Sequence, residues 1–187
     1  MYISDIFETA QRLRRLPVSF EMFPPKGELT LERAREVAAS FAPLGPDFIS
    51  VTYSAGGSGN NAATTQIAQM IDTELAIPSV AHLTCISLKR ADLLAKIDEM
   101  RAAGIQNVLA LRGDVPQGAP TGPGCADYRY AKDIIPHLVD ASFCVGAAAY
   151  PEGHIECDDL ELSVRQLKEK QDAGASFLVT QLFFDNQ

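Results

Sequence analysis

Several features are missing from this 187-residue sequence. Its four cysteines (Cys85, Cys125, Cys144 and Cys157) include no Cys-x-x-Cys pair, which suits reduced cytosolic thiols better than a disulfide framework or a zinc site. No apolar run approaches the ~20 residues that a membrane span needs. The N-terminus also lacks the basic and apolar regions of a signal peptide. We therefore expect a cytoplasmic chain without a membrane partner.

Basic charge and metal-ligand patterns are also scarce. The net charge of -8 argues against a nucleic-acid partner or an anionic membrane surface. His82, His137 and His154 fall on separate predicted elements, so no metal site is expected. The glycine-rich segment 54–61 lacks the order of a dinucleotide or Walker fingerprint. No nucleophile with an adjacent base stands out either.

What the sequence does contain is a regular alternation of apolar strands and amphipathic helices. A helix is predicted over 1–16, with apolar residues at helical spacing. Strands are predicted over 18–23, 48–53, 78–84, 108–112, 143–149 and 177–182. Between them lie helices with apolar faces. Thr30, Ser87 and Asp158 are predicted to cap three of these helices, and Gly104 to close one.

This order predicts an α/β fold of the (β/α)8 TIM-barrel type, as a single domain over 1–187. The strands are apolar throughout, as parallel strands covered on both faces are. Because such a barrel typically needs ~250 residues, the barrel is incomplete here, with six of the eight strands. A doubly wound sheet is the alternative, but Pro24-Pro25 replaces its usual glycine-rich first turn.

Polar residues collect at the ends of these strands. Arg112 and Asp114 bracket Gly113 just after the fourth strand, where ligands bind in parallel α/β proteins. A local ion pair that caps the strand is the alternative. Glu21 lies between Phe20 and Met22 in the first strand, so we expect it to be buried, with the raised pKa that suits a general acid.

Other polar residues have alternative structural interpretations. His82 suits a satisfied core histidine as well as a ligand. Tyr53 and Tyr150 suit core aromatics whose hydroxyls reach water, and Thr52 suits an ordinary strand residue. No single residue decides between binding and packing. However, six strands each deliver a polar group to the same side, which is hard to obtain from packing alone.

Six segments together resemble methylenetetrahydrofolate reductase. They run in the family's order from Val18 to Phe184: VSFEMFPPK (18–26), FISVTY (48–53), AHLTC (81–85), LALRGD (109–114), AYPEGH (149–154), and DAG (172–174) with TQLFF (180–184). No one of them would be specific alone. The resemblance implies a flavin-dependent barrel in which FAD binds at the carboxyl ends of the strands. Reduced nicotinamide, NADH or NADPH, would pass hydride to the flavin, and 5,10-methylenetetrahydrofolate would then accept it to give 5-methyltetrahydrofolate.

The resemblance also implies residue roles. Glu21 matches the general acid that helps open the methylene bridge of the folate, and Asp114 matches the carboxylate that tunes flavin and pterin. Gln181 matches a pterin-binding residue. Positions that match FAD contacts are Thr52, Tyr53, Ala55, His82, Arg112, Gly113, Asp114, Tyr130, Ala131, Tyr150, His154 and Lys170. The flavin would supply the hydride step. The protein would orient the reactants, supply a proton and tune the electric field around them.

Two departures from the family pattern bear on these roles. Ser163, Gln166 and Glu169 stand where relatives carry other polar residues near the adenosine end of FAD. The chain also ends after the sixth strand. The alternative function is therefore a flavin- or pterin-binding partial barrel without turnover, completed by another chain; a homo-oligomer or partner chain is expected. An aldolase-like or pterin-condensing barrel is a third possibility. We expect little activity from the 187 residues alone, because open strand edges are sticky.

Overall fold

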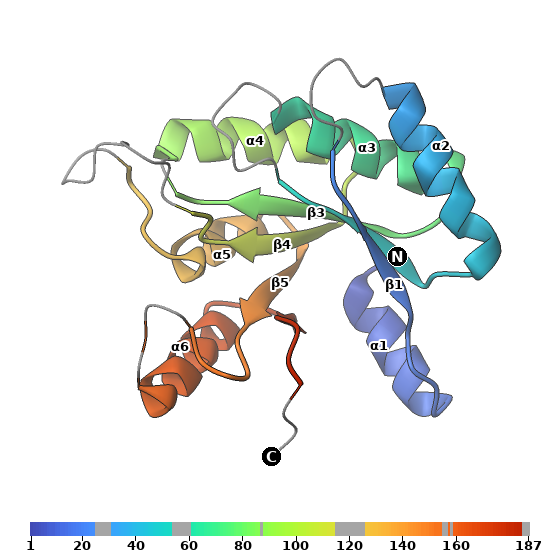
Figure 1. Ribbon diagram of the computed structural model, residues 1–187. Coiled ribbons are helices and arrows are strands. Elements are labelled where there is room, and N and C mark those ends of the chain that lie inside the picture. Colours follow the sequence, from blue (N-terminus) through green and yellow to red (C-terminus); the bar gives the residue numbers. More distant parts are fainter. Residues whose placement is uncertain are drawn as a thin grey trace.

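The computed structural model describes residues 1–24, 31–53, 61–86, 88–114, 126–154, 157 and 159–184, with the side chains of 61 and 62 left aside. Helices and strands alternate along the chain (Figure 1). The helices are α1 (Ile3–Arg12), α2 (Leu31–Phe41), the 3-10 helix η1 (Ala42–Leu44), α3 (Asn61–Glu74), α4 (Arg90–Ala102), α5 (Ala131–Asp140) and α6 (Leu160–Asp172). The strands are β1 (Ser19–Met22), β2 (Phe48–Val51), β3 (Ser79–Thr84), β4 (Asn107–Leu111), β5 (Cys144–Ala149) and β6 (Phe177–Thr180).

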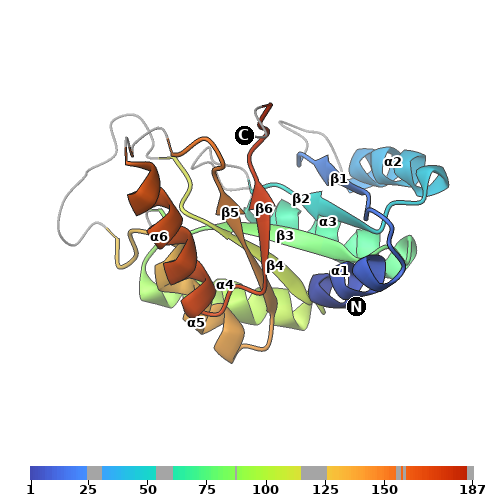
Figure 2. The same cartoon turned by 90° about the horizontal axis from the view of Figure 1, so that it is seen from below.

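The strands form one curled parallel sheet. Its order is β1-β2-β3-β4-β5-β6, so every strand pairs with its neighbours in the sequence. In a doubly wound sheet the order of the strands reverses at a switch point. The strand order of this sheet does not reverse. The curl is visible in the two views of Figures 1 and 2. The prediction of an incomplete TIM-type barrel is therefore confirmed.

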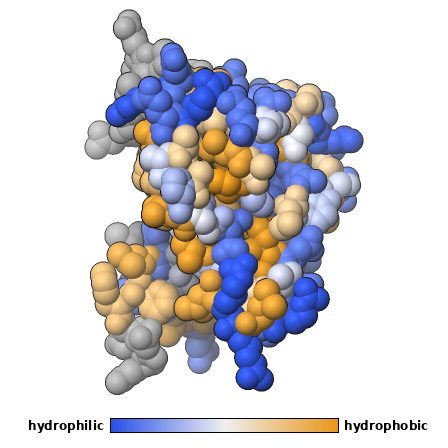
Figure 3. Space-filling model, turned by 90° about the vertical axis from the view of Figure 1, so that its right-hand side faces the viewer, coloured by the Kyte–Doolittle hydropathy of each residue, from blue (hydrophilic) through white to orange (hydrophobic). Residues whose placement is uncertain are grey.

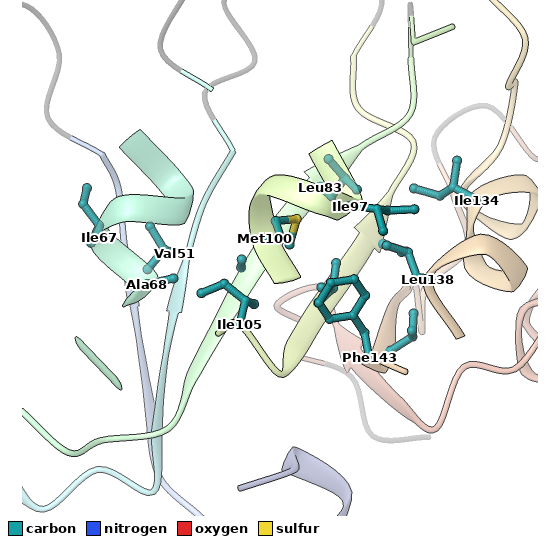
Figure 4. Close-up of a cluster of buried hydrophobic side chains, with 14 of the residues drawn as sticks. Val51, Ile67, Ala68, Leu83, Ile97, Met100, Ile105, Ile134, Leu138 and Phe143 are labelled. Atoms are coloured by element: carbon teal, nitrogen blue, oxygen red, sulfur yellow. The ribbon is translucent and has the colours of Figure 1, made fainter. Parts of the chain in front are cut away.

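Two apolar cores lie on opposite faces of the sheet. The outer core fills the space between the strands and α2 to α5 and includes Ala81 of β3. Leu83 of the same strand packs among Ile97, Met100 and Ile134 (Figure 4). The inner core lies inside the curl and includes Val80 of β3 and Phe177 of β6, packed against α1. Because side chains alternate along a strand, His82 shares the inner face with Val80.

Helix α1 closes the amino-terminal end of the curled sheet. Ile3 and Ile6 are buried in the inner core. The buried Asn107 side chain fixes the helix, since its Oδ1 accepts a hydrogen bond from Ile3 N (2.9 Å). Its Nδ2 donates to Ser79 O, also at 2.9 Å. With this end filled, the inner face is left to the carboxyl ends of the strands.

Some local predictions were wrong. The apolar face expected for each helix is not buried in α6, where Leu160 and Val164 are 56% and 57% exposed and Ser163 is the buried residue. Asp159 caps this helix by accepting a hydrogen bond from Leu162 N (3.0 Å). The N-cap of α4 is Lys89. The expected caps at Thr30, Ser87 and Asp158 lie outside the described residues.

The two outermost strands leave apolar side chains in solvent. Leu178 of β6 is 44% exposed, and Val179 beside it is also exposed. Phe23, just after β1, is exposed as well. The side of the molecule that carries α1 and α2 shows hydrophobic surface between hydrophilic residues (Figure 3). Among the described residues, β1 and β6 each pair with one strand, so these edges are where further structure could add.

Candidate active site

The candidate site lies at the carboxyl ends of the strands, because a parallel sheet delivers all these ends to one side. Thr52 follows β2 and continues the ladder, since its N donates to Met22 O (2.9 Å). Gln181 follows β6 in the same way, with its N donating to Ala149 O (2.8 Å). Ala55, a further predicted FAD contact, lies outside the described residues.

Glu21 and His82 approach each other on the inner face. His82 is 6% exposed, and its Nε2 lies 3.7 Å from Oε2 of Glu21. Burial lowers the pKa of His82 to about 4, which favours the neutral imidazole. The Glu21 side chain, in contrast, is 49% exposed. The expectation that Glu21 is buried was wrong: Phe20 and Met22 pack toward the helices, and Glu21 projects from the opposite face of an edge strand.

The chain after β4 is pressed against the end of β3. Cys85 N donates to Leu111 O (3.0 Å) and Ile86 N to Arg112 O (2.8 Å), so the pairing continues past both strands. Gly113 has φ +82°, and a Cβ there would lie 2.8 Å from Cβ of Thr84. Only glycine combines this backbone with this close approach. Arg112, predicted as the last strand residue, comes one residue after β4, half-buried, and Asp114 is exposed.

Tyr150, His154 and Lys170 gather beyond β5. The rings of Tyr150 and His154 meet edge to face with centroids 4.7 Å apart. Lys170 Nζ donates to Ala148 O (2.7 Å) and lies 5.8 Å from the centre of the Tyr150 ring. Burial lowers the pKa of Lys170. The structure therefore holds a half-buried cation against the carboxyl end of β5.

The ends of β4 and β5 form one electrostatic group. Burial raises the pKa of the Tyr150 phenol, with Arg112 lowering it and Asp114 raising it. Both charged side chains thus act on the same hydroxyl. The arrangement brings together an aromatic pair, two cations and a carboxylate, which suits a flat ligand with anionic substituents.

Other predicted contacts stand apart from this group. Tyr53 packs partly against the outer core, and burial together with Glu99 raises its pKa to about 12. Tyr130 is the exposed N-cap of α5, where its N donates to Oδ2 of Asp133 (2.8 Å), and the adjacent Ala131 is buried. The alternative of a core aromatic therefore describes the packing of Tyr53 well.

Sequence reasoning missed two residues that shape the site. Thr84 supports the close approach of Gly113, and Ser50 pairs with Glu21 on the strand between Glu21 and His82. Their position near strand ends was the available signal, but small hydroxyl residues are common in strands. Among the described residues, no group of three or more His, Cys, Asp or Glu could hold a metal ion. Nor does any described helix have the length and apolar character to cross a membrane.

The comparison with known families decides the assignment. The family model described as methylenetetrahydrofolate reductase matches residues 7–187. The chain belongs to the methylenetetrahydrofolate reductase family. Except for DAG (172–174), which ends α6, and residues 25–26, which lie outside the described residues, its family-like segments lie on strands of the curled sheet or just after their carboxyl ends. Most of the family-like residues therefore reach the site described above.

Curated relatives support the same family. Methylenetetrahydrofolate reductase 1 of Schizosaccharomyces pombe is 33% identical over 189 residues, covering 99% of this chain and 31% of the relative. The 5,10-methylenetetrahydrofolate reductase of Pectobacterium carotovorum subsp. carotovorum is 37% identical over 172 residues, covering 91% and 56%. The Escherichia coli enzyme of that name is 35% identical with the same coverage. The chain thus spans little more than half the length of these bacterial relatives, and about a third of the yeast one.

Solved structures show the fold alone. The deoxyribose phosphate aldolase of Aeropyrum pernix superposes with a TM-score of 0.56 at 17% identity, over 97% of this chain and 72% of the aldolase. A 2,3-dimethylmalate lyase gives a TM-score of 0.58 at 14% identity, over 97% and 62%. At such identities the likeness concerns the arrangement of strands and helices.

Proposed function

We propose that this chain carries the catalytic face of a flavin-dependent enzyme that reduces 5,10-methylenetetrahydrofolate to 5-methyltetrahydrofolate, with NADH or NADPH as the hydride source. The observation that carries the proposal is that the family model matches residues 7–187 and that family-like residues follow the carboxyl ends of β2, β3, β4, β5 and β6. The setting would be one-carbon metabolism and methionine biosynthesis in the cytoplasm.

The residues beyond β4 and β5 fit FAD. Gly113 leaves no side chain over the end of β3, so the backbone can approach a flat ring closely. Arg112 and Lys170 offer positive charge to the cofactor's anionic groups, and the Tyr150–His154 pair offers aromatic faces. When bound, FAD supplies the redox chemistry by accepting hydride from the nicotinamide and giving it to the folate.

Glu21 and Gln181 would serve the folate. Glu21 projects from the inner face, and its exposure lets the carboxyl reach a substrate there. Its task is to give a proton to the folate nitrogen as the methylene bridge opens. Gln181 follows the far strand and would hydrogen-bond the pterin. Asp114, exposed beside the Tyr150 hydroxyl, adds negative charge that disfavours electron-rich flavin.

A second candidate function is a flavin- or pterin-binding partial barrel without turnover, completed by another chain. The observation that favours it is the pair of open strands, with β1 and β6 each bonded to one neighbour among the described residues and Leu178 exposed. Unpaired parallel edges invite association. We therefore expect the 187 residues alone to retain FAD weakly, to oligomerise or aggregate, and to turn over little folate.

Two measurements, each made on two proteins, separate these possibilities. A visible flavin spectrum in protein purified with FAD distinguishes both flavin-binding candidates from an aldolase-like barrel. Oxidation of NADH or NADPH with menadione as acceptor then tests for electron transfer. These assays should be run on the 187 residues and on a chimaera in which the remaining sequence of the Pectobacterium reductase follows residue 184. A gain of FAD retention and folate reduction in the chimaera supports the proposal. A chimaera that folds but binds no flavin contradicts it.

A further inference from the structure

The Nε2 atom of His82 stands out inside the curled sheet. Among the buried side-chain nitrogen and oxygen atoms that the structure describes, it is the one without a hydrogen-bond partner. Buried polar groups in folded proteins almost always have partners, so an orphan atom points to an interaction at that place. The charged atom that faces it is Oε2 of Glu21, at 3.7 Å.

The strand order explains how two residues from separate strands meet. Glu21 pairs with Ser50 of β2, and Ser50 pairs in turn with Val80, two residues before His82. The small Ser50 side chain leaves room for the longer side chains to approach each other across β2. Because the Glu21 carboxyl is half exposed, rotation of its side chain can close the separation to a hydrogen bond of ~2.8 Å.

We propose that His82 is a positioning residue for Glu21: its neutral imidazole carries the hydrogen on Nε2 and donates it to the Glu21 carboxylate. A bare Nε2 lone pair facing a carboxylate oxygen would repel it, whereas an N–H attracts it. This tautomer gives the orphan atom a partner. It also holds the carboxyl on the inner face, where neither packing nor another described ion pair fixes it.

The surroundings of His82 leave Glu21 as its charged partner. The inner-face neighbours on the adjacent strands are the uncharged Ser50 and Leu109. Arg112 and Asp114 come after the end of β4. Burial lowers the pKa of His82, and an ionised carboxylate beside it acts in the opposite direction.

In the mechanism, the hydrogen bond from His82 would orient the Glu21 carboxyl toward the substrate. This consequence rests on the proposed function, in which Glu21 gives a proton to the folate. An exposed carboxyl on an edge strand has many rotamers, and a hydrogen bond from a rigid, buried ring selects among them. His82 acts through Glu21 in this role, without touching the reacting atoms.

The test is nitrogen-15 NMR of the three histidines in the 187-residue chain, without flavin, nicotinamide or folate. His82→Gln assigns the resonance by its loss. In the unmodified chain we expect neutral His82 as the Nε2–H tautomer. In Glu21→Gln the midpoint of His82 protonation should fall by about one pH unit, because the carboxylate no longer stabilises the imidazolium. Glu21→Asp, which keeps the charge on a shorter side chain, should give a smaller fall.

Glu152→Gln is the matched control, since Glu152 is an exposed carboxylate at the same end of the sheet. It should leave the tautomer and the midpoint of His82 unchanged. An Nδ1–H tautomer, a midpoint unmoved by Glu21→Gln, or an equal change in Glu152→Gln would overturn the proposed pair. The measurement uses no cofactor or substrate, so it tests the pair separately from the enzymatic function. The pair can be present while the proposed function fails, and the function can hold while the pair is absent.

Discussion

Gly113→Ala tests whether the close approach at the end of β4 is built into the fold. Gly113 has φ +82°, and a Cβ there would meet Cβ of Thr84 at 2.8 Å and Cγ2 of Ile86 at 3.0 Å. Left-handed backbone costs a non-glycine residue about 1–2 kcal/mol, and overpacking adds about 1–3 kcal/mol. We therefore expect Gly113→Ala to lose about 2–5 kcal/mol of unfolding free energy, a large part of the ~5–15 kcal/mol of an ordinary domain.

Gly104→Ala separates the two contributions. Gly104 has φ +76°, close to that of Gly113, but an added Cβ would meet nothing within 4 Å. It should lose only the backbone contribution of about 1–2 kcal/mol. Both substitutions reduce the conformational entropy of the unfolded chain by the same amount, so this effect cancels when the two variants are compared.

The assay is urea unfolding followed by circular dichroism, with FAD affinity measured on the same samples. Gly113→Ala should lose about 1–3 kcal/mol more stability than Gly104→Ala and should also bind FAD more weakly, because the end of β4 is displaced. Equal losses of unfolding free energy in the two variants would show that Thr84 and Ile86 move aside at no cost. The close approach at Gly113 would then not constrain the fold.

Two further predictions concern charge at the strand ends. Asp114→Asn should leave FAD bound but change its reduction potential and the rate of folate reduction, as measured by potentiometric titration and stopped-flow absorbance; identical potentials and rates in both proteins would refute the role of Asp114. Burial holds the pKa of His82 at about 4, below its ordinary 6.5, so its contribution to stability is complete above pH 6.5 and is lost as the pH falls toward 4. Urea unfolding across this range should show that the free energy of unfolding falls by at most about 3 kcal/mol. This pH-dependent fall should be absent in His82→Leu and present in the control His137→Gln.

Much of the fold could be predicted from the sequence because parallel strands covered on both faces are apolar throughout. Leu109 and Ala110 are examples, one facing the inner core and one the outer. The βα order then predicts neighbours in the sheet. The left-handed cap at Gly104 also followed from its place after a helix, and the structure confirms it.

The exposure of Glu21 could not be predicted in this way. Its large neighbours Phe20 and Met22 suggested an apolar environment, yet side-chain alternation sends them to the face opposite Glu21. Whether the face that carries Glu21 is covered depends on which segments lie beside β1. Those segments are distant in the sequence, so the residues around Glu21 do not reveal them. The same limit explains α6, where helical spacing correctly predicted an apolar face but not its exposure at Leu160 and Val164.

The approach of Glu21 to His82 was also beyond the sequence. The two residues come from strands that are not adjacent, and the separation of 3.7 Å depends on the register of β2 between them. The sequence placed each residue on a strand near the same end of the sheet. Only the assembled sheet shows that the two side chains face each other.

The proposed function requires that this face of the sheet gives a proton to a folate while a flavin gives the hydride. The most direct test compares Glu21→Gln with the unmodified protein in the chimaera, measuring the two half-reactions separately by anaerobic stopped-flow absorbance. Flavin reduction by NADH or NADPH should be unchanged, and flavin reoxidation by 5,10-methylenetetrahydrofolate should slow by about 10²–10⁴-fold, because only the folate needs the proton. An equal fall in both half-reactions would contradict the claim and leave Glu21 with a structural role.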